Sequence, residues 1–209
     1  LIGNFYQPKL VFEDLDFLDT LPKREKTSGW AEAIKHSLIQ DYDLYKEFHE
    51  NYENIYKLDN EYSAEILKKS VAIKAKIVSN DEFERGDERI KLNYGHTVGH
   101  AIEKISNYNQ YLHGEAVSIG MMVAASISMR MGYISSQEVE QQQKILLKYN
   151  LPVKLKDIDV DSILEAIKMD KKNSNGKVRW VLLESIGKAI ISQDVKEEIV
   201  IKSINDILI

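Results

Sequence analysis

Apolar residues recur at three- and four-residue spacing along most of the chain, a pattern typical of amphipathic helices. The first run includes Ala31 and Ile34 after Pro22, and it continues through Leu44 and Phe48 towards residue 51. The same periodicity predicts further helices over residues 61–79, 89–106, 114–131, 137–148, 162–169 and 197–207.

Strand patterns are confined to short segments. Residues 178–183 and 189–192 flank a turn that contains Gly187, which predicts a β-hairpin, and residues 9–13 predict a short strand after Pro8. The predicted fold class is therefore mostly α, a helical domain with a small β-hairpin.

The predicted helix over residues 114–131 is apolar almost all round and rich in Ala, Gly and Ser, which indicates a central helix packed closely on its neighbours. Ser118, Gly120 and Arg130 interrupt its apolar run, so it does not predict a membrane span. No charged and then apolar signal segment opens the chain, and we expect a cytoplasmic protein without a membrane partner.

The amino-acid composition limits the kinds of partner and site that the chain can have. The 209 residues are 44% hydrophobic and 29% charged, within the globular range, and the net charge of -5 argues against a nucleic-acid partner. The chain has no Cys, which excludes disulfides, thiolate metal sites and cysteine nucleophiles. Any metal must therefore be held by histidines and carboxylates.

Three of the five histidines, His96, His100 and His113, lie within eighteen residues. On one continuous helix, Arg89, Asn93, His96 and His100 would line a stripe of roughly 60 degrees of arc. Two imidazoles four residues apart commonly bind one divalent ion. The residues alone allow any three of these histidines and a distant carboxylate to be the ligands.

A zinc-protease motif is the obvious alternative for His96 and His100. That motif needs a catalytic Glu directly after its first histidine, and Thr97 stands there. Peptide hydrolysis is therefore disfavoured. His113 is followed by Gly114 and Glu115, which suit the start of the predicted central helix.

Glu32 and Lys35 lie three residues apart, a spacing that by itself is typical of a surface ion pair. Their apolar neighbours, among them Trp30 and Ile34, leave little polar surface, which favours a buried pair beside a metal and an anion.

Other lysines carry less information. Lys74 and Lys76, and the Asp170-Lys171-Lys172 run that is predicted to open a polar loop before the hairpin, are each typical of solvated surface when taken singly.

Taken in order, these segments resemble the 3-dehydroquinate synthase family over essentially the whole chain. The specific motifs are LNYGHTVGHAIE at residues 92–103 and LHGEAV at residues 112–117. Supporting matches lie at residues 1–8, 17–22, 31–35, 73–78, 81–82, 170–172 and 176–177.

The resemblance implies a metal, usually Zn²⁺ with Co²⁺ as the alternative, held by Glu32, His96 and His113. The family positions that bind the substrate's hydroxyls, carboxylate and phosphate correspond to Lys35, Lys74, Arg89, Asn93, His100 and one of Lys171 and Lys172. The segment that contacts NAD corresponds to Phe17, Leu18, Asp19 and Thr20.

The activity implied is that of a phosphate-eliminating lyase of the shikimate pathway. Such an enzyme converts 3-deoxy-arabino-heptulosonate 7-phosphate, a sugar-acid phosphate, to 3-dehydroquinate with catalytic NAD. The resemblance further implies a two-domain architecture shared with iron-type alcohol dehydrogenases, and a homodimer for the full-length protein. Residues 1–19 would end an N-terminal nucleotide-binding domain that precedes Leu1, and residues 20–209 would form the helical metal- and substrate-binding domain. We expect the chain to be inactive alone.

Three other interpretations of the function remain open. Another sugar-phosphate cyclase would share the metal site, although Lys74, Asn93 and His100 together favour dehydroquinate as product. An iron-type polyol dehydrogenase would share the architecture but lacks the combined motifs at residues 93–100 and 113–116. A folded metal-binding fragment without catalysis is the third.

Overall fold

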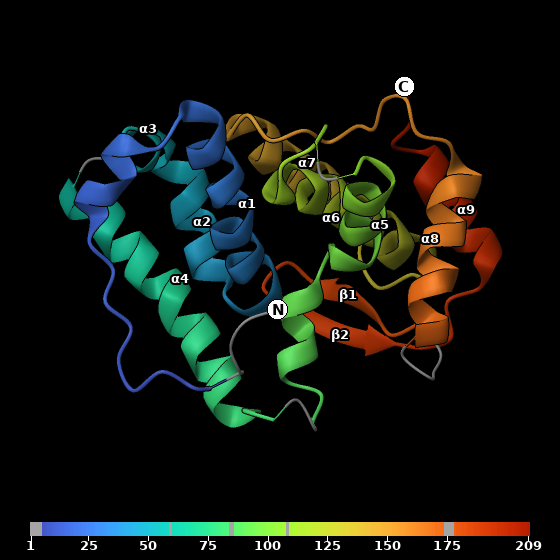
Figure 1. Cartoon of the computed structure of the whole chain (residues 1–209), viewed down its shortest axis with the longest axis horizontal. Coiled ribbons are helices and arrows are strands. Elements are labelled where there is room, and N and C mark those ends of the chain that lie inside the picture. The colour runs from blue at the N-terminus through green and yellow to red at the C-terminus, as the bar shows by residue number, and fades with distance from the viewer. Residues whose placement is uncertain (1–5, 59, 84–85, 108, 174–177) are drawn as a thin grey trace.

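A computed structural model describes residues 6–58, 60–83, 86–107, 109–173 and 178–209, without the side chains of Asn60 and of residues 170–173. The chain is mostly helical and carries one small antiparallel hairpin (Figure 1), which confirms the predicted fold class. The elements are η1 (Leu15–Thr20), α1 (Lys23–Gln40), α2 (Tyr42–Glu50), α3 (Tyr52–Tyr56), α4 (Asn60–Asn80), η2 (Arg89–Asn93), α5 (His96–Ile105), α6 (His113–Arg130), α7 (Ser136–Lys148), α8 (Val160–Asn173), β1 (Trp180–Ser185), β2 (Lys188–Ser192) and α9 (Glu197–Asn205). Among the described residues, no helix is long and apolar enough to span a membrane.

Helix α6 is the centre of the fold. In Figure 1 it lies between a group formed by α1 to α4 and a pair formed by α8 and α9, with the hairpin below it, and it packs against α1, α5, α7, α9 and β1. Nearly every side chain from Gly114 to Ser128 is buried. This burial explains why its sequence is apolar all round instead of striped.

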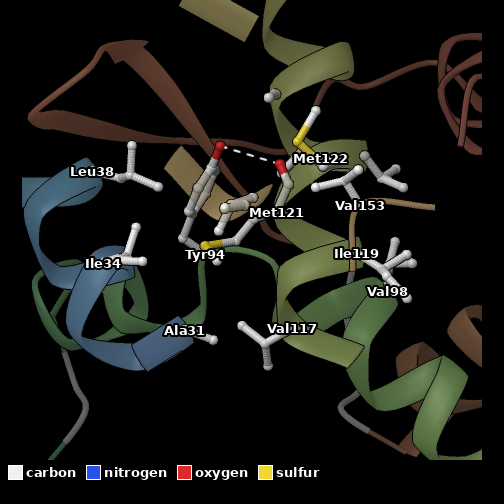
Figure 2. Close-up of a cluster of buried hydrophobic side chains, with 14 of the residues drawn as sticks. Ala31, Ile34, Leu38, Tyr94, Val98, Val117, Ile119, Met121, Met122 and Val153 are labelled. Carbon is white, nitrogen blue, oxygen red and sulfur yellow. Dashed lines mark hydrogen bonds between the residues drawn. The ribbon is translucent and has the colours of Figure 1, made fainter. Parts of the chain in front are cut away.

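Tyr94 joins several of these elements. Figure 2 shows its ring between α1, which contributes Ile34 and Leu38, and Met121 of α6. The hydroxyl of this fully buried residue donates to the Oε1 of Gln142 on α7 at 2.7 Å and approaches the carbonyl of Met121 at 3.3 Å. Because a buried hydroxyl without a partner is costly, these bonds fix the segment before α5 against α6 and α7.

Glycines allow α6 to approach its neighbours closely. A Cβ on Gly120 would lie 2.0 Å from the carbonyl oxygen of Gly95, and a Cβ on Gly114 would lie 1.9 Å from that of Ser28. Neither contact leaves room for a side chain. The backbone of α6 therefore touches the start of α5 at one glycine and α1 at the other.

The predicted continuous helix over residues 89–106 is wrong. Residues Arg89–Asn93 form the short 3-10 helix η2, and α5 begins only at His96. Gly95 separates them with a φ of +80°, a left-handed conformation that ends helical continuity and favours glycine. Arg89 and Asn93 therefore do not share a helical stripe with His96 and His100, as the periodicity had predicted.

The structure also corrects three smaller predictions. Residues 9–13 do not form a strand, since no strand of the described chain lies beside them to accept their hydrogen bonds. The first helical run is broken at Asp41, which is extended and caps α2 by accepting from the backbone N of Leu44 at 2.9 Å. Residues 170–172 belong to α8, which is longer than predicted, and not to a loop.

The predicted hairpin is confirmed with slightly shifted ends. Its strands pair in antiparallel register, with Leu182 opposite Ile190. At the turn, the backbone N of Gly187 donates to the carbonyl of Leu38 at 2.8 Å, so the hairpin is anchored to the end of α1.

The glycine contacts lead to the first testable expectation. Gly120→Ala should lower the free energy of unfolding by about 3 kcal/mol, because the added methyl group overlaps the Gly95 carbonyl. Gly29→Ala is the matched control. Gly29 is an exposed residue of α1 whose Cβ would meet nothing within 4 Å, so alanine there should raise stability by up to about 1 kcal/mol. Urea unfolding measures both, and equal effects would contradict the role given to the close contact.

Candidate metal centre

Three side chains from different helices converge at one end of α6. Glu32 lies in the middle of α1, His96 is the first residue of α5 and His113 is the first residue of α6. The Oε1 of Glu32 is 3.5 Å from Nε2 of His96 and 3.8 Å from Nε2 of His113. One candidate ligand atom from each residue lies within 4.8 Å of the others, a spacing that suits a common ion.

The close helix contacts bring these residues together. Ser28 lies one helical turn before Glu32 on α1, and its Oγ accepts a hydrogen bond from the backbone N of Gly114 at 3.0 Å. That bond places His113, the preceding residue, beside Glu32. Arg24 adds a bidentate ion pair with Glu115, at 2.7 and 2.6 Å, between the same helix ends.

Hydrogen bonds indicate which ring nitrogen of each imidazole carries the proton. The Nδ1 of His96 lies 3.1 Å from the carbonyl oxygen of Tyr94, and the Nδ1 of His113 lies 3.1 Å from Oε1 of Glu103. Because a carbonyl and a carboxylate only accept, each Nδ1 carries the proton. Each Nε2 is then the atom with a free lone pair, and both face Glu32.

The carboxylate of Glu32 has two different oxygens. Oε2 accepts from the Nζ of Lys35 at 2.8 Å, whereas Oε1 is buried and has no hydrogen-bond partner. An unpartnered buried acceptor costs about 1 to 3 kcal/mol, which a cation between Oε1 and the imidazoles would offset. A carboxylate with two neutral imidazoles is a donor set that Zn²⁺ and Co²⁺ accept.

The protonation states favour the same interpretation. Burial raises the pKa of Glu32, but the adjacent Lys35 ammonium outweighs it and leaves the pKa below its ordinary value. Burial, reinforced by Lys35, lowers the pKa of His96 to about 4. At neutral pH the site therefore holds an anionic carboxylate and a neutral imidazole, the forms that bind metals.

Of the pair predicted to be buried, Lys35 is buried, with only 2% of its side chain exposed, whereas the Glu32 side chain is partly buried, at 32% exposed. Burial lowers its pKa, and the ion pair with Glu32 works against that shift. Lys74 on α4 is exposed, and its charge is close enough to lower the pKa of Lys35 further. These two lysines thus place positive charge beside the carboxylate.

The other residues expected to bind the substrate lie on α5, η2 and α8. His100 is exposed, and its ring centroid lies 5.2 Å from that of His96 and 6.2 Å from that of His113. Arg89 and Asn93 lie on η2, which packs against α1 and α4, and the Arg89 guanidinium donates to the carbonyl of Glu82 at 2.8 Å. The side chains of Lys171 and Lys172 lie outside the described residues.

The expected NAD segment lies apart from the three convergent residues. Phe17, Leu18, Asp19 and Thr20 belong to η1, where the Phe17 side chain is 72% exposed. Phe17 and Leu18 line a hollow of about 410 Å³ together with Phe12, Trp30 and Leu67. None of Glu32, His96 and His113 lines this hollow.

Glu103 is a polar residue of the site to which the sequence analysis assigned no role. It is buried, and with His100 and His113 it forms a second group whose ligand atoms lie within 4.8 Å of one another. Its position seven residues after His96, two turns along the same helix face, was the available signal.

Comparison with known proteins identifies the family. The family described as "3-dehydroquinate synthase C-terminal" matches residues 29–173. The chain belongs to the 3-dehydroquinate synthase family. Two curated 3-dehydroquinate synthases, from Campylobacter concisus (strain 13826) and Acinetobacter baumannii (strain AYE), are 42% and 43% identical to it over 99% and 98% of its length. The chain spans 58% and 56% of their lengths.

Solved structures of sugar-phosphate cyclases share the fold of this 3-dehydroquinate synthase family member. A 2-deoxy-scyllo-inosose synthase, solved with carbaglucose-6-phosphate, NAD⁺ and Co²⁺, matches 99% of the chain with a TM-score of 0.81 and 28% identity, over 58% of its own length. The valiolone synthase ValA from Streptomyces hygroscopicus subsp. jinggangensis 5008, solved with NAD⁺ and Zn²⁺, matches 93% of the chain and 54% of its own, with a TM-score of 0.83 and 21% identity.

A buried histidine, His36, lies beside the candidate centre. His36 follows Lys35 on α1, and its Nδ1 is 2.8 Å from the Oγ of Ser70 on α4, while its buried Nε2 has no hydrogen-bond partner. Burial, followed by the charge of Lys35, lowers the pKa of His36 from 6.5 to about 4. The folded protein therefore resists protonation of a group that the unfolded chain protonates readily.

This shift sets a pH dependence of stability. Because the pKa is lower in the folded state, the unfolded state binds more protons as the pH falls from 6.5 to about 4, and stability is lost over that window. At about 1.4 kcal/mol per pKa unit, metal-free wild type should lose about 3 kcal/mol more than His36→Asn across it. His49→Asn, at an exposed histidine, should behave as wild type in the same denaturant titrations. Parallel curves for wild type and His36→Asn would refute the expectation.

Proposed function

We propose that this chain is the metal- and substrate-binding part of a 3-dehydroquinate synthase, a lyase of the shikimate pathway. The reaction would convert 3-deoxy-arabino-heptulosonate 7-phosphate to 3-dehydroquinate and phosphate, with NAD used catalytically. Family membership supports this proposal, and the observation that carries it is the buried, unpartnered Oε1 of Glu32 facing Nε2 of His96 and of His113.

The proposed ligands of a Zn²⁺ or Co²⁺ ion are Glu32, His96 and His113. When bound, such an ion lowers the pKa of a substrate hydroxyl and polarises a neighbouring carbonyl. Three protein ligands leave a coordination position for substrate oxygen, as catalytic zinc sites require. Co²⁺ is supported by the 2-deoxy-scyllo-inosose synthase, which was solved with that ion.

Lys35 has a structural and an electrostatic task in this proposal. Its bond to Oε2 holds the Glu32 carboxylate so that Oε1 faces the imidazoles. With Lys74, it supplies positive charge for an anionic substrate, whose carboxylate and phosphate need cationic partners. Arg89, Asn93 and His100, and one of Lys171 and Lys172, are the further proposed substrate contacts.

The NAD contact is assigned to Phe17, Leu18, Asp19 and Thr20. This assignment is supported by the exposure of Phe17, which lines the hollow beside α1 and leaves an apolar surface for a nucleotide cofactor or for the domain that holds it. We propose that residues 1–19 end a nucleotide-binding domain and that residues 20–209 form the helical domain. A cytoplasmic homodimer is the proposed state of the whole protein.

A related candidate is another sugar-phosphate cyclase, which the 28% identical inosose synthase supports. An iron-type polyol dehydrogenase is weaker, because that class lacks the combined motifs at residues 93–100 and 113–116. Such an enzyme would reduce NAD stoichiometrically and release no phosphate. Substrate choice separates the cyclases, because the heptulosonate has a carboxylate and the glucose 6-phosphate analogue has none.

The decisive test is a steady-state assay of the full-length protein that carries this chain. We expect phosphate release from the heptulosonate with a trace of NAD, little turnover of glucose 6-phosphate, and no phosphate release by residues 1–209 alone. A preference for the sugar phosphate without a carboxylate would favour the other cyclases, and phosphate release by residues 1–209 alone would contradict the proposed division of the chain.

Arg89→Gln tests the proposed carboxylate contact. Loss of one charge-assisted partner in a desolvated site costs about 2 to 5 kcal/mol, so kcat/KM with the heptulosonate should fall about 30-fold or more while bound zinc is unchanged. Lys91→Gln is the matched control on η2, because the Lys91 ammonium already pairs with Glu88 at 2.6 Å. Wild-type efficiency of Arg89→Gln would remove Arg89 from the proposed substrate contacts.

A further inference from the structure

His96 and His113 are held to very different degrees. The His96 side chain is 12% exposed, and a backbone carbonyl orients its ring. The His113 side chain is 47% exposed, and a side chain, Glu103, orients it through Nδ1. An exposed histidine at the first residue of a helix has several rotamers open to it. Of the two proposed histidine ligands, His113 is therefore the one whose position depends more on its hydrogen-bond partner.

Glu103 is well placed to hold that ring. Its carboxylate lies on α5 and is only 10% exposed, and its Oε1 is 3.1 Å from Nδ1 of His113. Helices α5 and α6 pack tightly where Gly99 meets Val117, at Cβ contact distances of 3.2 Å and above, so the carboxylate and the ring are carried on elements fixed to each other. The hydrogen bond is thus built into the packing of the two helices.

We propose that Glu103 is a positioning residue for the metal centre, acting through His113. The proposal rests on the proposed metal site. By accepting the Nδ1 proton, Glu103 leaves Nε2 as the coordinating nitrogen and turns it towards Oε1 of Glu32. A carboxylate on the far nitrogen also makes the imidazole a stronger donor to a cation.

Glu103 also decides between two possible ion positions. The residues His100, Glu103 and His113 form the alternative group, in which a Glu103 oxygen would have to be a ligand itself. As long as Nδ1 of His113 donates to Oε1 of Glu103, that nitrogen keeps its proton and cannot be the His113 ligand of the alternative group. The bond therefore directs the ion to Glu32, His96 and His113.

The test measures zinc affinity by competition with a chromophoric chelator, and the visible absorption of the Co²⁺ form, which reports ligand geometry. Both use the full-length protein. Glu103→Ala should weaken zinc binding about 10- to 100-fold and alter the Co²⁺ bands. Glu103→Gln keeps an acceptor for Nδ1 but loses the charge, so we expect a smaller loss, about tenfold, with a measurable spectral shift.

Three further variants give the reference points. His96→Ala should abolish tight zinc binding, and His100→Ala should leave zinc affinity and the Co²⁺ bands as in wild type. Asp206→Asn is a matched loss of a carboxylate, since Asp206 pairs with Arg130 at 2.9 Å at the opposite end of α6. It should lower stability without moving the Co²⁺ bands, which separates positioning from a general structural effect.

The outcomes separate this inference from the metal site on which it rests. Wild-type affinity and Co²⁺ bands in Glu103→Ala, with zinc lost in His96→Ala, would overturn the positioning role alone. Zinc retained by His96→Ala would overturn the metal site itself. Zinc lost in both His100→Ala and Glu103→Ala but kept in His96→Ala would make Glu103 a ligand of the alternative group. If Glu103→Ala does not fold, Glu103→Gln decides, and wild-type values there overturn the proposal.

Discussion

Helix α6 touches α1 and α5 backbone to backbone, and these contacts determine where the first residues of α5 and α6 lie. At Gly114 and Gly120 the neighbouring carbonyls stand where a Cβ would be, so α6 meets both helices without intervening side chains. A typical helix pair is 8–10 Å apart because side chains separate the axes. Here the missing side chains bring the first residues of α5 and α6 to the middle of α1. The side chains of Glu32, His96 and His113 can then reach one point.

The same contacts bring charged side chains into a mostly buried place, where each charge needs a partner. Glu32 and Lys35 place opposite charges at the edge of the core, where burial disfavours the charged form of each. Their ion pair satisfies Lys35 and one oxygen of Glu32, but it leaves Oε1 without a partner. This unpartnered Oε1 faces Nε2 of His96 and of His113, and a divalent cation between these atoms would give it a partner.

Much of the fold follows from the sequence, because helical periodicity and the all-apolar run at α6 are local signals. The hairpin was equally readable from its turn. The break at Gly95 could not be predicted, because a glycine between helical segments is compatible with a continuous helix until its φ is known. The strand expected at residues 9–13 failed for a similar reason, as strands need partners that local sequence does not reveal.

The candidate site, too, could be predicted only in part from the sequence. Histidine spacing left the ligand set open, and the resemblance narrowed it; only the folded chain places Glu32 within 3.8 Å of both imidazoles and gives Glu103 a role. A divalent ion at this point of convergence can be located by anomalous scattering at the zinc edge from crystals grown with Zn²⁺. We expect one peak within bonding distance of Oε1 of Glu32 and of Nε2 of His96 and His113. A peak on His100, Glu103 and His113 instead would show that the ion does not bind at Glu32.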